Sequence, residues 1–175
     1  MIHEINFQNI FLVLVVSIGS VYDIKTRKIP NWLNFGTVLI VILFGLISFK
    51  MDIVLNALIG FFVGILLLLI PYLTGTMGAG DVKLLGALGA IVGFKNIILI
   101  FLYTAVSGGV VGIIWLMFNP ERLKFLITTG QVLPAIDKKQ KLPYGTVIFL
   151  GTFIYIILGD KYISDLPIWQ LIQHL

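Results

Sequence analysis

The sequence predicts an all-α, polytopic membrane protein with about six transmembrane helices and its N-terminus outside. Of its residues, 59% are hydrophobic and only 11% are charged, whereas soluble domains carry about 25% charged residues. Several charge-free stretches reach the length of about 20 apolar residues that a bilayer-crossing helix needs. Basic residues gather in the links on one side. We therefore expect residues 1–175 to form a single membrane-embedded domain.

Six charge-free segments account for the predicted helices. They run from Ile5 to Tyr22, Ile29 to Phe49, Ile53 to Gly80, Leu84 to Phe94, Asn96 to Pro120 and Leu142 to Gly159. Five are long enough to span. The fourth, with eleven residues, has a length more typical of a buried or re-entrant helix. Because Lys83 and Lys95 can snorkel to opposite interfaces and extend it, we count it as a span.

The first segment is expected to be a retained helix. Glu4 stands where a signal peptide would carry basic residues, and no small-residue cleavage site follows the apolar run.

Lys and Arg residues predict the orientation. Six spans with an outside N-terminus leave three basic residues outside, namely Lys50, Lys95 and Lys161. The other nine lie in the cytoplasm: Lys25, Arg27, Lys28, Lys83, Arg122, Lys124, Lys138, Lys139 and Lys141. This is the positive-inside bias, and a re-entrant fourth segment would spoil it. Topology thus explains the net charge of +4, and we expect the lipid bilayer, and no nucleic acid, as a partner.

Glycines spaced by three or four residues predict close helix packing. They are Gly60 and Gly64, then Gly86, Gly89 and Gly93, then Gly108 and Gly112. The long link after the fifth segment contains residues 121–133, which we expect to form an amphipathic interfacial helix; the tail over residues 162–175 could do the same outside.

Residue inventory narrows the chemistry. The chain has no cysteine, which excludes disulfides, thiolate metal sites and a cysteine nucleophile. Its two histidines, His3 and His174, form no HExxH motif and no Ser/His pair. We therefore expect neither a metal nor another cofactor.

Two aspartates stand apart from the other acidic residues, which lie in ordinary loops. Asp23 ends the first segment, and Asp81 follows the glycine-containing stretch 74–80 before the fourth. By the parity of the spans, both face the cytoplasm at similar depth. Two carboxyl groups that share one proton are what aspartyl proteolysis requires. The alternative is that both are interfacial helix ends, with Asp81 as an N-cap.

The residues around these aspartates resemble a known family. Asp23 to Asn31 (DIKTRKIPN), Gly78 to Lys83 (GAGDVK) and Leu142 to Gly145 (LPYG) together resemble type IV prepilin and preflagellin peptidases, which are GxGD aspartyl membrane proteases. The resemblance covers nearly the whole chain. It implies that Asp23 and Asp81 are catalytic.

The same resemblance implies the reaction and its place. Such an enzyme removes a short basic leader from prepilin-like precursors, at the cytoplasmic face of a prokaryotic inner membrane. It also implies residues that bind substrate or shape the site: Gly78, Gly80, Lys83, Pro30, Asn31, Pro143, Tyr144 and Gly145. Bifunctional members carry a large cytoplasmic insertion between the first two spans. Here only residues 25–28 connect them, so the chain is similar to the small monofunctional branch of tight-adherence pilus systems, and methyltransferase activity is not expected.

Three other functions stay open at this point, and one of them is that of a catalytically inactive assembly protein. Tyr22-Asp23 together with the GxGD stretch also resembles presenilin-type intramembrane proteases, although residues 29–31 are not part of that pattern. A small carrier or channel component would share six helices and glycine faces, but it usually needs charged groups near the bilayer midplane.

Overall fold

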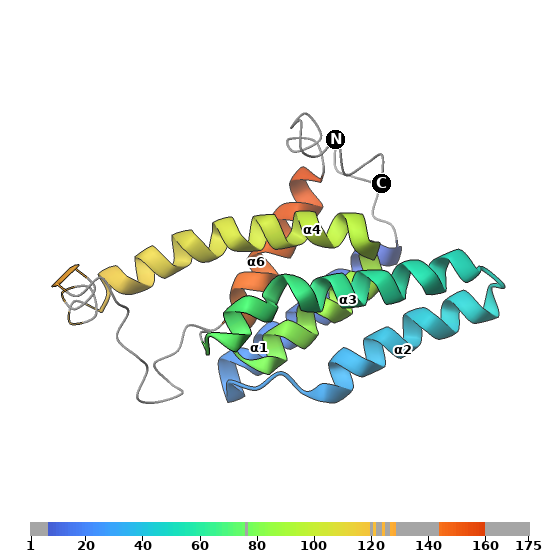
Figure 1. The fold of residues 1–175 in the computed structure, drawn as a ribbon, viewed down its shortest axis with the longest axis horizontal. Coiled ribbons are helices and arrows are strands. Elements are labelled where there is room, and N and C mark those ends of the chain that lie inside the picture. The colour runs from blue at the N-terminus through green and yellow to red at the C-terminus, as the bar shows by residue number, and fades with distance from the viewer. Residues whose placement is uncertain are drawn as a thin grey trace.

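The computed structural model describes residues 7–75, 77–119, 121, 124, 127–128 and 144–159, and its described helices are shown in Figure 1. These helices are α1 (Phe7–Thr26), α2 (Asn31–Ile47), α3 (Met51–Leu73), α4 (Ala79–Met117) and α6 (Tyr144–Leu158). Helices α1, α3 and α4 are long and apolar enough to cross a membrane, and α2 and α6 are shorter apolar helices. The predicted all-α class is confirmed for the described residues.

Helix α4 contains the predicted fourth and fifth segments, joined at a break. Gly93 has φ 80° and ψ 174°, a backbone conformation that only glycine adopts readily. The Gln8 side chain of α1 donates a hydrogen bond to the Ile91 carbonyl (2.5 Å), and the Phe94 N–H donates to Asn56 Oδ1 of α3 (3.4 Å). Side chains thus satisfy backbone groups that the break frees. Figure 1 shows the green first part of α4 inside the bundle and the yellow second part returning across it.

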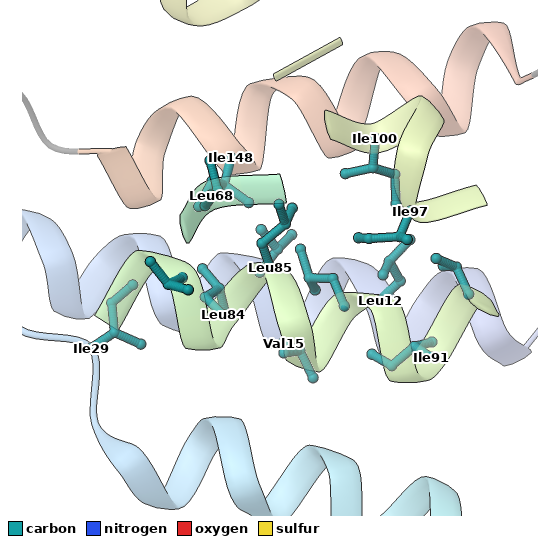
Figure 2. Packing of buried hydrophobic residues seen from close by; sticks show 14 of the residues in the cluster. Leu12, Val15, Ile29, Leu68, Leu84, Leu85, Ile91, Ile97, Ile100 and Ile148 are labelled. Atoms are coloured by element: carbon teal, nitrogen blue, oxygen red, sulfur yellow. The ribbon is translucent and has the colours of Figure 1, made fainter. Parts of the chain in front are cut away.

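The first part of α4 forms the centre of the bundle. Every residue from 81 to 93 except Lys83 is buried. Helix α4 packs against α1, α2, α3 and α6. Figure 2 shows the core cluster, in which Leu84 and Leu85 of α4 lie among side chains of the other helices, including Leu12, Val15, Leu68 and Ile148. Large apolar side chains on the outer faces of α2 and α3 are exposed, as a lipid-facing surface requires.

Glycines bring α3 and α4 into backbone contact. A Cβ at Gly60 would collide with the Gly89 carbonyl oxygen, and one at Gly64 would lie 2.6 Å from the Leu85 carbonyl oxygen. The predicted packing role is confirmed for these positions. At Gly112, in contrast, a Cβ would meet no described atom within 4 Å, so that glycine packs no neighbour in the described chain.

The predicted interfacial helix over residues 121–133 falls mostly outside the described residues. Positions 121, 124, 127 and 128 are helical and exposed. The predicted tail helix over 162–175 lies wholly outside, as do His3 and His174.

The α3–α4 contact yields a stability prediction. Gly60→Leu would force the two backbones apart. We expect it to lower the free energy of unfolding by about 1–3 kcal/mol, as overpacking does. The measurement is the melting temperature of the purified protein in detergent. The matched control is Gly112→Leu, the same substitution in open space, which should leave the melting temperature nearly unchanged. Equal losses in both variants would contradict the packing described.

Candidate active site

Asp23 belongs to the buried face of α1. The buried residues of this helix are Leu12, Val15, Val16, Gly19, Ser20 and Asp23, a spacing that places them on one side of a helix. Asp23 is only 7% exposed although it lies in the last turn. Helical periodicity therefore turns this carboxyl group into the bundle and away from the surrounding solvent or lipid.

Asp81 lies in the first turn of α4. Gly78 is the N-cap residue, with φ −86° and ψ 151°. Its N–H donates a hydrogen bond to Asp81 Oδ2 (3.1 Å), so the carboxylate reaches back over the start of its own helix. Asp81 is 8% exposed. Asp81 is not the N-cap, as one alternative had it, because it is the third residue of the helix and Gly78 occupies the N-cap position.

The two carboxyl groups lie at the same end of the bundle, where α1 ends and α4 begins. Asp23 lies close enough to act electrostatically on Asp81. Each carboxylate accepts a backbone N–H at Oδ2, from Gly78 for Asp81 and from Gly145 for Asp23 (2.9 Å). Tyr144 also lies within electrostatic reach of Asp81. Helices α1, α4 and α6 thus converge on one pair of acids.

Gly145 is required at this place by its contact with Asp23. A Cβ there would lie 2.8 Å from Asp23 Cβ and 3.0 Å from Asp23 Oδ2, so any side chain would push α6 away. Just beyond, Ser20 Oγ donates to Thr146 Oγ1 (3.4 Å). Both contacts join the end of α1 to the start of α6, and this orients the Asp23 carboxylate.

The Lys83 side chain contacts the start of α2. Its Nζ donates a hydrogen bond to Asn31 Oδ1 (3.0 Å) and lies 5.6 Å from the centre of the Phe35 ring. Pro30 is the N-cap of α2, with φ −70° and ψ 139°. Gly80 packs against the α1–α2 link, where a Cβ would lie 3.2 Å from Ile29 Cβ.

The structure divides the predicted site residues into two groups. Gly78 and Gly145 donate hydrogen bonds to Asp81 and Asp23, and Tyr144 lies within electrostatic reach of Asp81. The others shape the surroundings: Gly80, Lys83, Pro30 and Asn31. Pro143 lies outside the described residues.

Ser20 and Thr146 are neighbours of the predicted site that the sequence analysis did not single out. Ser20 precedes Asp23 by three residues, so its position on the same helix face was a usable signal. Among the described residues, no group of three His, Cys, Asp or Glu side chains could hold a metal ion.

Comparison with known proteins gives a family match. The model of the type IV leader peptidase family matches residues 10–113. These residues contain both aspartates. No solved structure gives a significant match to the chain.

Curated relatives are similar over part of their length. Two proteins named prepilin leader peptidase/N-methyltransferase, from Burkholderia pseudomallei strains 1026b and K96243, are 30% identical over 146 residues, which is 80% of this chain and 45% of each relative. One of the same name from Pectobacterium carotovorum subsp. carotovorum is 37% identical over 103 residues, which is 55% of this chain and 37% of that protein. The chain therefore spans less than half the length of these relatives.

The contact between α1 and α6 can be tested with cysteines, since the chain has none of its own. The Ser20 and Thr146 hydroxyls lie 3.4 Å apart, so Ser20→Cys/Thr146→Cys should form a disulfide on mild oxidation in membranes. Ser20→Cys/Thr152→Cys is the control, because Thr152 lies on α6 more than one turn further along. Cross-linking in the control pair but not in the first pair would show that α6 starts elsewhere.

Proposed function

Because this chain belongs to the type IV leader peptidase family, we propose that it is a membrane aspartyl endopeptidase that removes the basic leader from prepilin-like precursors. The observation that carries the proposal is the pair of buried carboxyl groups. Asp23 and Asp81 come from different helices, lie within electrostatic reach of each other and are each held by a backbone N–H.

The chemistry follows from this pairing. Two carboxyl groups in a poorly hydrated place cannot both ionise cheaply, so they hold one proton between them. The ionised group takes a proton from a water molecule, whose oxygen attacks the scissile carbonyl carbon. The protonated group donates a hydrogen bond to the carbonyl oxygen. When the tetrahedral intermediate collapses, the C–N bond breaks and the leaving amine takes a proton from the pair.

An extended substrate can reach the acids over the glycines that precede Asp81. Gly75 and Gly78 are exposed, and Gly78 contributes no side chain beside the Asp81 carboxylate. A substrate backbone can therefore come close without meeting a Cβ. Leader cleavage needs such an approach, because the scissile bond must leave helical structure before it enters the site.

We place the site at the cytoplasmic face of the inner membrane. Helices α1, α2 and α3, the two parts of α4, and α6 would make six crossings with the N-terminus outside. The reversal of the chain at Gly93 supports two membrane crossings by α4, one by each of its parts. Helices α2 and α6 have 17 and 15 residues, and local bilayer thinning accommodates such lengths. Asp23 and Asp81 then lie on the side that carries most basic residues.

The methyltransferase activity named in the relatives is not part of the proposal. Helix α1 ends at Thr26 and α2 begins at Asn31, so the link between them is too short to hold a second catalytic unit.

Replacement of the acids tests the proposal. Asp23→Asn and Asp81→Asn should each lower cleavage by about 100-fold to 10,000-fold, because neither amide can take part in proton transfer. The assay co-expresses the protein with prepilin-like precursors and follows leader removal by gel shift. The control is Asp52→Asn, at an exposed aspartate in the first turn of α3, which should retain full activity. Cleavage by the double variant Asp23→Asn/Asp81→Asn would refute the assignment. Transport of a solute that persists in the same double variant would favour the carrier alternative.

The depth of the acids leads to a second test. Asp23 and Asp81 lie in terminal turns of their helices, so cleavage is expected at the membrane edge. Precursors with the scissile bond moved one, two or three helical turns into the apolar segment should be cut progressively less. Mass spectrometry of the products locates the cut. Efficient cleavage deep inside the apolar segment would favour the presenilin-type alternative.

A further inference from the structure

The α1–α2 link continues from the helix that carries Asp23 and passes beside the start of α4, the helix that carries Asp81. After Asp23, the Arg27 N–H bonds to the Asp23 carbonyl (2.9 Å), and Arg27 has φ 53°. This is a left-handed conformation that turns the chain sharply. Thr26 Oγ1 bonds to the Lys28 carbonyl (3.0 Å) and holds the turn. The link therefore leaves α1 in a defined direction.

The same link then packs against the start of α4. Ile29 is 7% exposed, although it lies in a connection between helices. It rests on Gly80, the residue before Asp81, where a Cβ would be 3.3 Å from the Ile29 backbone nitrogen. One short segment thus touches the backbone beside the second acid and continues from the helix that carries the first.

Lys83 fastens this arrangement from the α4 side. It follows Asp81 by two residues, and its ammonium donates to Asn31 Oδ1 at 3.0 Å while lying over the Phe35 ring. Both partners belong to the first turns of α2. This hydrogen bond ties the start of α4 to the start of α2. We expect it to restrain rotation of the first turn of α4, and therefore the direction of the Asp81 side chain.

We propose that the α1–α2 link is a strap that sets the separation of the two catalytic carboxyl groups, and that the Lys83–Asn31 hydrogen bond is its latch. In this role Lys83 and Asn31 are positioning residues that contact neither the substrate nor the reacting atoms. The catalytic meaning of the strap rests on the proposed function. Its geometric meaning, a fixed distance between positions 23 and 81, can be measured without any substrate.

The geometric test uses the absence of native cysteine. Asp23→Cys/Asp81→Cys is treated in membranes with a short bifunctional thiol reagent, with the latch intact or carrying Lys83→Met. We expect cross-linking to slow by at least about fivefold without the latch, because the two positions then separate or fluctuate. The matched control is Lys95→Met: Lys95 also lies over a phenylalanine ring, at 5.7 Å, but beyond the Gly93 break and away from Asp81. Unchanged cross-linking in Lys83→Met would overturn the strap.

The kinetic test is a double-mutant cycle. Lys83→Met and Asn31→Leu should each lower kcat by about 10-fold to 100-fold with KM unchanged, and the double variant should be no worse than either single one. The reciprocal exchange, Lys83→Asn with Asn31→Lys, should restore part of the activity. Multiplicative losses or a raised KM would make Lys83 a substrate contact and overturn the latch.

The pH profile separates positioning from mere stability. Among the described residues, Arg27 acts electrostatically on Asp23, and Tyr144 lies within electrostatic reach of Asp81. Activity needs one proton on the pair, and weaker coupling between more distant acids narrows the pH range in which that state prevails. Latch variants should therefore show a narrower range, whereas a variant that only unfolds more easily keeps the wild-type width. An unchanged width in both latch variants would count against the strap.

The two proposals fail in different ways. If the wild-type protein cleaves no precursor but cross-linking still depends on the latch, the peptidase assignment falls and the strap stands. If the wild type cleaves and the latch variants behave like wild type in every assay, the strap falls and the peptidase assignment stands.

Discussion

The placement of two acidic side chains inside a mainly apolar bundle is the constraint on which the structure depends. A carboxylate removed from water is costly unless hydrogen bonds and charged partners compensate it. Asp23 and Asp81 obtain this compensation locally, since each accepts a backbone N–H from the start of a helix, Gly145 of α6 and Gly78 of α4. Helix starts carry unpaired N–H groups and a partial positive charge, so they suit this purpose.

Close helix approach is the second requirement, and glycine supplies it. Gly60 and Gly89 let the backbones of α3 and α4 touch, and Gly145 lets α6 reach Asp23. In a bilayer, helices gain little from hiding apolar surface from lipid, so backbone contact and interhelical hydrogen bonds contribute more to association. The glycines between α3 and α4 and the glycine beside Asp23 therefore act in the same way, because each allows a close approach that a Cβ would block.

The break at Gly93 divides the 39 residues of α4 into two helical parts that fit the bundle. A single straight helix over Ala79–Met117 would carry Asp81 and Met117 to opposite ends of a rod far longer than a bilayer is thick. At Gly93 the chain turns, and Gln8 and Asn56 bond the backbone groups released there. Nearly all of the first part remains buried, and Asp81 at its start lies at the edge of the core.

The sequence by itself determined the class of protein and most helices, and it predicted Asp23 and Asp81 as a pair of acids. Long charge-free runs have few alternatives to membrane helices, and Asp23 and Asp81 stand in terminal turns of two such helices. Tertiary structure decided the contacts. Gly145 meets Asp23 across 122 positions of sequence, and Lys83 meets Asn31 across 52. Local periodicity shows which way a side chain faces on its own helix, but it carries no information on which helix lies opposite, because that depends on how all the helices pack together.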